Sequence, residues 1–181
     1  MGQERTIPRR NRRFTRTAAV ILGIGCMGCM HQPQTRQEFV KLVAGGAATS
    51  DKESKLTQKD LDSLVTLLEE RSKACLGKRV NRSGMVGGQM EVSGTSYTPS
   101  VRRVSDAKAE FTLQLEHSPR GIGPDMPAGG FYMMAADLVR QAPERTQVDL
   151  YYATMAQNSD EILGAVRAWT SGEPAACPEL E

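Results

Sequence analysis

Hydrophobic and polar positions alternate at two different spacings along this chain of 181 residues. Over residues 57–75 the apolar side chains fall three or four positions apart, which is typical of an amphipathic helix. Over residues 108–117 they fall at every second position, with Phe111, Leu113 and Leu115 facing one way. That alternation predicts a strand with one buried and one solvated face.

The two longest predicted helices carry end signals. Thr57 with Asp60 resembles a capping box at the start of the first, and Gly77 provides its stop. Asn158 with Glu161 predicts the start of a closing helix that stops at Gly172. The apolar face of this closing helix comprises Ile162, Leu163, Val166 and Trp169.

The remaining pattern predicts short strands and one short helix. Residues 37–43 predict a helix with Phe39, Val40 and Val43 on one side, and residues 47–55 are polar, either loose or leading into a short strand near Lys55 and Leu56. The expected strands cover residues 79–83, 85–96, 101–104, 108–117, 131–139 and 147–155, with breaks at glycine, serine and proline. Strands clustered between helices predict an α+β fold, an antiparallel sheet of about five strands with the N- and C-terminal helices packed on one face.

This order of elements loosely resembles a reduced helix-grip, or START-like, fold. The resemblance implies that a long C-terminal helix lies across a curved antiparallel sheet. It rests on the order of the elements alone, and no sequence motif accompanies it.

The N-terminal residues form a pattern of their own. Six arginines and one glutamate occupy the first sixteen residues, and residues 18–30 then carry no charge. An uncharged apolar run of about 13 residues suits a secretory signal and falls short of the roughly 20 that span a bilayer. Arginines before such a run keep that end in the cytoplasm.

The end of the apolar run resembles the lipobox of bacterial lipoproteins. Small residues precede Cys26 and Cys29, and in that family such a cysteine is diacylated and becomes the new N-terminus. The resemblance implies lipidation of Cys26, with Cys29 as the alternative. It divides the chain into a signal peptide (1–25), a lipidated tether (26–50) and a single domain (51–181). The expected location is the cell envelope, facing the periplasm, and the absence of Asp after either cysteine favours the outer membrane.

Charge and cysteine content agree with this location. Outside the first sixteen residues, 17 Lys and Arg face 20 Asp and Glu, so the domain is mildly acidic and offers no electrostatic basis for nucleic-acid binding. Cys75 and Cys177 are the two cysteines beyond the signal, and we expect them to form a disulfide. The Cys26–Cys29 pair lacks both the βαβ context of a redox site and a second pair of zinc ligands.

No arrangement of residues predicts catalysis, a metal site or a cofactor. His117 is the one histidine of the domain, and a triad with Asp137 and a serine is conceivable, but no nucleophile elbow accompanies it. Glu110 and Glu116 share one face of their strand, and a solvated sheet face explains them more simply than an active site. We therefore expect no enzymatic activity.

Methionine and tyrosine side chains on two neighbouring strands leave a ligand-binding alternative open, because both adapt to apolar ligands. The leading hypothesis is a lipid-anchored, non-enzymatic accessory or interaction module with an envelope protein as its partner. The alternative is a domain that binds a hydrophobic ligand or lipid in a cavity between sheet and helix. The residues expected to line that cavity are Phe131, Tyr132, Met134, Tyr151, Tyr152 and Trp169.

Overall fold

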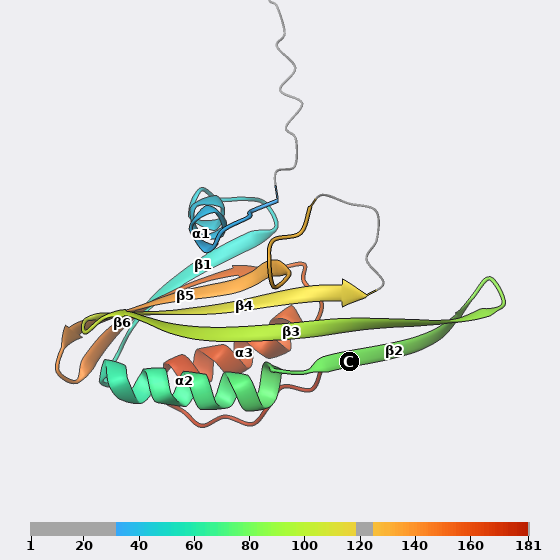
Figure 1. Ribbon diagram of the computed structural model, residues 1–181. Coiled ribbons are helices and arrows are strands. Elements are labelled where there is room, and N and C mark those ends of the chain that lie inside the picture. The colour runs from blue at the N-terminus through green and yellow to red at the C-terminus, as the bar shows by residue number, and fades with distance from the viewer. Residues whose placement is uncertain (1–31, 119–124, 181) are drawn as a thin grey trace, which may run out of the picture. The chain divides into compact units, whose positions relative to one another are not determined.

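The computed structural model describes residues 32–118 and 125–180, which belong to one compact unit with an α+β fold (Figure 1). Its elements in chain order are α1 (Arg36–Ala44), β1 (Ser50–Thr57), α2 (Leu61–Leu76), β2 (Arg79–Val86), β3 (Gln89–Ser105), β4 (Lys108–Ser118), β5 (Phe131–Ala142), β6 (Arg145–Ala153) and α3 (Ser159–Thr170). The strands form one antiparallel sheet in the order β1-β6-β5-β4-β3-β2. The predicted α+β class and antiparallel sheet are confirmed.

The described residues form six strands, whereas the sequence predicted about five. The sequence left open only a short strand near Lys55 and Leu56, whereas β1 pairs with β6 from Ser50 opposite Ala153 to Thr57 opposite Thr146. Its sequence, SDKESKLT, contains one large apolar residue, Leu56, whose side chain is 49% exposed. An edge strand with charged side chains avoids unwanted pairing, and it lacks the alternating pattern that identifies a strand.

The main core lies between the sheet and the helices α2 and α3. Leu61, Leu64 and Leu68 from α2 and Ile162 and Trp169 from α3 are almost completely buried there. They pack against Phe111, Leu113, Leu138, Val148 and Leu150 from the sheet. The apolar faces of β4 and α3 were therefore predicted correctly. The other face of β4 is not solvated throughout as predicted, because Glu110 is buried beneath α1.

Helix α1 lies on the opposite face of the sheet from α2 and α3 (Figure 1). Phe39 and Val43 bury themselves against Ala135, with Tyr132 and Tyr151 packed around them. The sequence predicted this helix but assigned it to the tether. The two long helices that it expected on one face of the sheet, α2 and α3, do share the main core. Phe39 and Val43 need a surface to cover them, so α1 forms a third layer.

Both predicted capping boxes are wrong. Strand β1 continues through Thr57, so α2 begins only after Asp60, whose carboxylate accepts the hydrogen bond from the Ser63 N–H at 2.9 Å. Asn158 precedes α3 in the left-handed region, with φ of 54°, and its side chain makes no capping hydrogen bond. Its amide instead donates to the Tyr97 hydroxyl at 3.0 Å.

The predicted disulfide joins Cys75, in the last turn of α2, to Cys177 in the C-terminal tail. The tail also accepts a hydrogen bond at Ala175 O from the Trp169 indole, at 3.3 Å. Ala175 and Leu180 pack against the main core. The disulfide thus holds the tail over the ends of α2 and α3.

Candidate functional site

The β2–β3 hairpin extends beyond the sheet (Figure 1). Strand β4 pairs with β3 only from Gly94 onward, so residues 82–93, which we call the arm, have no other strand beside them in the described part of the chain. The turn at the tip contains Gly87 and Gly88 with φ of 59° and 82°, a conformation that glycine adopts without strain. From Gly94 to the tip the arm rises about 20 Å.

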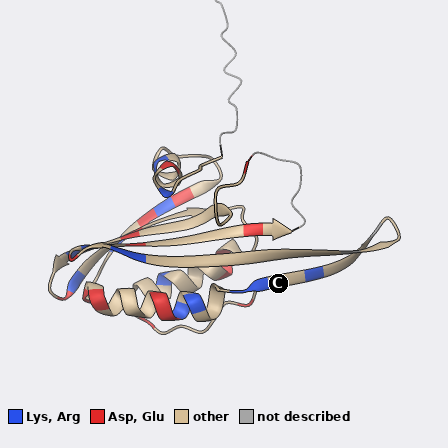
Figure 2. Cartoon of the chain, viewed as in Figure 1, with Lys and Arg blue, Asp and Glu red and all other residues tan. Residues whose placement is uncertain are grey.

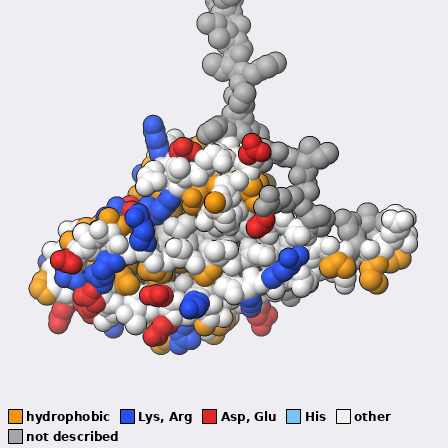
Figure 3. Space-filling model, viewed as in Figure 1, with side chains coloured by type: hydrophobic (Ala, Val, Ile, Leu, Met, Phe, Trp, Pro, Cys, Tyr) orange, Lys and Arg blue, Asp and Glu red, His pale blue; other side chains and the backbone are white. Residues whose placement is uncertain are grey.

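One face of the arm carries exposed apolar side chains. Met85 lies opposite Met90, and Ser83 lies opposite Val92. Because cross-strand partners and alternate residues share a face, Met85, Met90 and Val92 form one stripe. Their side chains are 69%, 75% and 59% exposed, and Figure 3 shows hydrophobic side chains along the outer part of the arm.

Charged residues accompany the apolar stripe: the arm contains Arg82 and Glu91 and has no net charge. Arg82 lies within it and Arg79 lies at its base, and Figure 2 shows basic residues along β2. Arg79 donates to the Asn81 side chain at 2.9 Å and lies so close to Gly94 that a Cβ there would be 2.7 Å from its Nε. A side chain at position 94 would therefore displace Arg79.

The base of the arm is anchored to α3 through Tyr97. The Tyr97 N–H donates to Lys78 O at 3.0 Å, and its hydroxyl donates to Gln157 O at 3.4 Å while accepting from Asn158. Burial raises the pKa of the Tyr97 phenol, and the Asn158 hydrogen bond and the Arg82 charge offset this only in part. The neutral hydroxyl thus remains a donor at physiological pH.

His117 also lies near this base, and the structure does not assemble a triad around it. Its Nδ1 lies 3.0 Å from the Thr95 hydroxyl. The carboxylate of Asp137, the proposed partner, lies 2.7 Å from Arg36. The imidazole and this carboxylate therefore belong to separate groups.

The six residues predicted to line a ligand cavity are divided between two faces of the sheet. Met134, Tyr152 and Trp169 are buried in the main core, with Phe131 packed against it. Tyr132 and Tyr151 lie on the α1 face, where the Tyr132 ring stacks on Phe39 at 5.9 Å between centroids. Adjacent residues of a strand point to opposite faces, so the six do not share one cavity. The interior beside α3 is filled, since Trp169 is completely buried.

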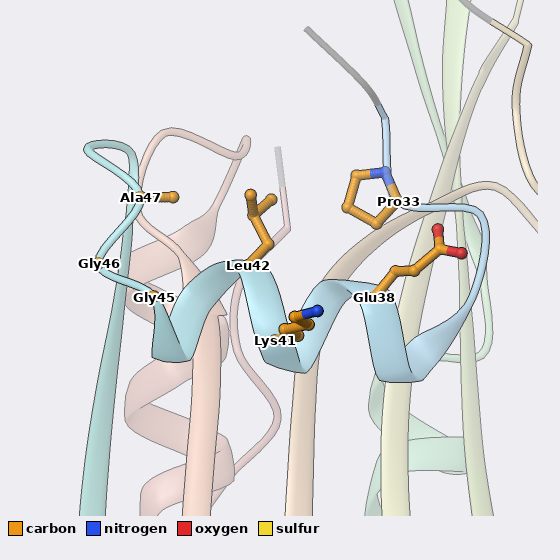
Figure 4. A pocket seen from close by; sticks show the side chains of 7 residues that line it. All are labelled: Pro33, Glu38, Lys41, Leu42, Gly45, Gly46 and Ala47. Carbon is orange, nitrogen blue, oxygen red and sulfur yellow. The ribbon is translucent and has the colours of Figure 1, made fainter.

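A groove of about 470 Å³ runs along the outer side of α1 (Figure 4). In this view Leu42 stands between Pro33 and Ala47, and it is 46% exposed. Lys41 and Glu38 contribute the charged part of the lining. This apolar surface belongs to α1, which lies within the predicted tether.

The proposed lipidation residues, Cys26 and Cys29, lie outside the described residues. Within the described residues, no helix combines the length and the hydrophobicity needed to cross a membrane. The same residues contain no group of three or more His, Cys, Asp and Glu side chains placed to hold a metal ion.

Comparisons with known proteins do not assign a family. No family model matches the chain, and no curated protein matches it either. Among solved structures, it is similar to a hypothetical protein, jhp0584 from Helicobacter pylori, with 11% identity and a TM-score of 0.40. The similarity covers 73% of this chain and 90% of the other.

Proposed function

We propose that this protein is a lipid-anchored component of the cell envelope that has no enzymatic activity and binds a protein partner through its arm. The observation that carries the proposal is the stripe formed by Met85, Met90 and Val92. Exposed apolar side chains gathered on one projecting element are typical of interaction surfaces, and methionine adapts to varied partners.

The fold itself does not require the arm. The main core lies elsewhere, and an isolated two-stranded hairpin is marginally stable in water. Its apolar stripe gains stability only when another surface covers it. A partner with a complementary apolar groove supplies such a surface, and the arginines of β2 favour an acidic rim around it.

The tether limits where that partner lies. If Cys26 carries the lipid, the chain between it and Gln32 spans at most about 20 Å when fully extended. The domain is then held close to the membrane, and so is the arm. We therefore propose a partner at the same membrane surface, with the outer membrane as the favoured location.

The helix-grip resemblance remains a proposal about the fold and not about activity. It is supported by the order of the strands and by the position of α3 against the sheet. The hydrophobic-ligand alternative gains no such support, because the side chains that would line the cavity are packed into the core or onto α1.

Site-specific photocrosslinking in intact cells tests the interaction. A photoreactive residue replaces Met90 in one strain and Leu56 in a control strain, because Leu56 is also exposed but lies on the opposite edge of the sheet. We expect a discrete protein adduct from position 90 alone, and we expect Met85→Asp in the same chain to abolish it. Equal adducts at both positions, or adducts with phospholipid only, would contradict a protein partner on the arm.

Mass spectrometry of the intact protein tests the anchor. We expect an acylated N-terminal cysteine at position 26, and Cys26→Ser should leave the protein unacylated while Cys29→Ser does not. Acylation that persists in Cys26→Ser and disappears in Cys29→Ser would move the anchor to Cys29. An unacylated wild-type protein would reject lipidation.

A further inference from the structure

A second polar site lies between α1 and the sheet, on the face opposite the main core. Arg36, in the first turn of α1, extends toward β5, where it donates to Ala136 O at 2.9 Å and to the Asp137 carboxylate at 2.7 Å. Its Nη1 lies 3.5 Å from Glu110 of β4. The Arg36 side chain is only 12% exposed, so its charge is held beneath the helix.

Two further cationic side chains lie beside Glu110. Arg102 of β3 donates to it at 2.6 Å, and Lys108 lies 3.5 Å from both Glu110 and Asp137. Three cationic side chains therefore face two carboxylates. Among these five side chains positive charge exceeds negative charge by one at neutral pH. Asp149, the cross-strand partner of Asp137, adds a nearby negative charge but accepts hydrogen bonds from Ser54 and Gln147.

The excess charge is accessible at Arg102. Its side chain is 65% exposed although its Nη2 is bound to Glu110, which leaves other guanidinium N–H groups for a ligand. Arg36 is different, because its Nε is buried and has no hydrogen-bond partner among the described residues. Unsatisfied buried donors are rare in native proteins and call for a partner.

A cavity of about 250 Å³ adjoins this cluster. The residues that line it are polar or charged apart from Tyr132, although about half of the lining surface is made of their apolar atoms. Besides Arg36, the residues that matter are Gln37, Ser100, Arg102, Glu110, Thr112 and Tyr132. They come from α1, β3, β4 and β5, so four elements of the folded domain must come together to form the cavity.

The chemistry of this lining defines a class of ligand. One excess positive charge matches one carboxylate, and an arginine binds a carboxylate through parallel hydrogen bonds. The hydroxyls of Ser100 and Thr112 and the amide of Gln37 match hydroxyl groups, and the Tyr132 ring offers a flat apolar surface. The volume is below that of most drug-sized sites, so it suits one ring and not a chain of several.

We propose that this cleft binds a small hydroxy acid of monosaccharide size, such as a sugar acid, with Arg102 holding its carboxylate. This binding site is separate from the arm and does not depend on the identity of any protein partner. Arg36 is a positioning residue in it, because it fixes α1 over Glu110 and Asp137.

Ligand-observed saturation-transfer NMR on the full-length protein in detergent micelles tests the site, with glucuronate as the probe. We expect saturable binding that weakens about tenfold or more in Arg102→Gln, because a charge-assisted hydrogen bond is lost. Arg145→Gln is the matched control, since Arg145 is exposed at the β5–β6 turn and should leave binding unchanged. Thermal unfolding of each variant checks that the fold is intact.

Two further probes separate the ligand class from simple charge attraction. Glucose has the ring without the carboxylate, and we expect it to bind about tenfold or more weakly than glucuronate. Inorganic phosphate has charge without the ring and should not displace glucuronate at equal concentration. Equal binding of glucose, displacement by phosphate, or unchanged binding in Arg102→Gln would each overturn the proposal.

Discussion

Glu110 is a carboxylate that the fold keeps charged in a mostly buried place. Burial alone would raise its pKa, but the hydrogen bond from Arg102 and the charges of Arg36, Arg102 and Lys108 outweigh this and lower the pKa below 4.5. The ionised form therefore contributes to stability above its ordinary pKa. That contribution is lost as the pH falls through the lowered pKa.

Glu110→Gln should consequently change how stability depends on acid. We expect the variant to be less stable than the wild type at neutral pH, and the difference to shrink as the pH falls from about 5 to about 3. Urea unfolding at a series of pH values measures this. A difference that stays constant across the series would show that the Glu110 charge contributes nothing.

Asn158 shows a residue whose role depends on a partner distant in sequence. It is the one non-glycine residue with positive φ among those described, and its amide reaches Tyr97 at the base of the arm. Asparagine tolerates this conformation better than most residues. This hydrogen bond thereby joins β3 to the start of α3.

Two substitutions at this position should separate backbone strain from the hydrogen bond. Asn158→Ala loses the bond and strains the backbone, and we expect it to lower the free energy of unfolding by about 1–3 kcal/mol. Asn158→Gly loses only the bond and should be the more stable of the two variants. Urea titration measures both values, and an alanine variant as stable as the glycine variant would contradict the backbone argument.

At the level of elements, β3 is longer than the sequence predicted. Two strands were expected over residues 85–96 and 101–104, whereas one strand runs from Gln89 to Ser105. Pro99 accounts for the error, because proline usually interrupts a strand. The Tyr97 N–H points away from β4 and donates to Lys78 O. Pro99 follows two residues later in the same strand, so the N–H that it lacks would point to that same side, away from β4. Proline is tolerated at such an edge.

We expect substitutions in the arm to impair partner binding without lowering the free energy of unfolding. Replacing Met85 and Met90 with serine should change the free energy of unfolding by less than about 0.5 kcal/mol, because both side chains are exposed. Leu113→Ala in the neighbouring strand β4 is the buried control and should cost about 2–5 kcal/mol. Urea unfolding makes the comparison, and a large loss in the serine variant would mean that the arm packs on the domain.

At the level of the whole molecule, the disulfide joins elements separated by 102 positions in sequence. Replacing both Cys75 and Cys177 with alanine should lower the free energy of unfolding by about 2–4 kcal/mol, since closing a long loop restricts the unfolded chain. Trp169 fluorescence should shift to longer wavelength if the freed tail also exposes the indole. Unchanged stability in the double variant would contradict the loop-closure argument.

Sequence pattern predicted the elements whose faces differ most in polarity. Strand β4 and helix α3 have clear apolar stripes, and their buried residues were identified correctly. The layers could not be predicted in the same way, because the short stripe of α1 does not indicate which face of the sheet it covers. The sequence did not predict the arm. Met85 and Met90 resemble core residues, and only the lengths of β2, β3 and β4 place them outside the core.

The pairing of β1 with β6 has a consequence for the newly made chain. Synthesis delivers the N-terminus first, so β1 cannot pair with β6 until nearly the whole domain has been made. Cys75 can form its disulfide only later still, because Cys177 lies in the C-terminal tail. A chain cut short before Cys177 would keep a free thiol at the end of α2, and a cell could recognise it as incomplete by that thiol alone.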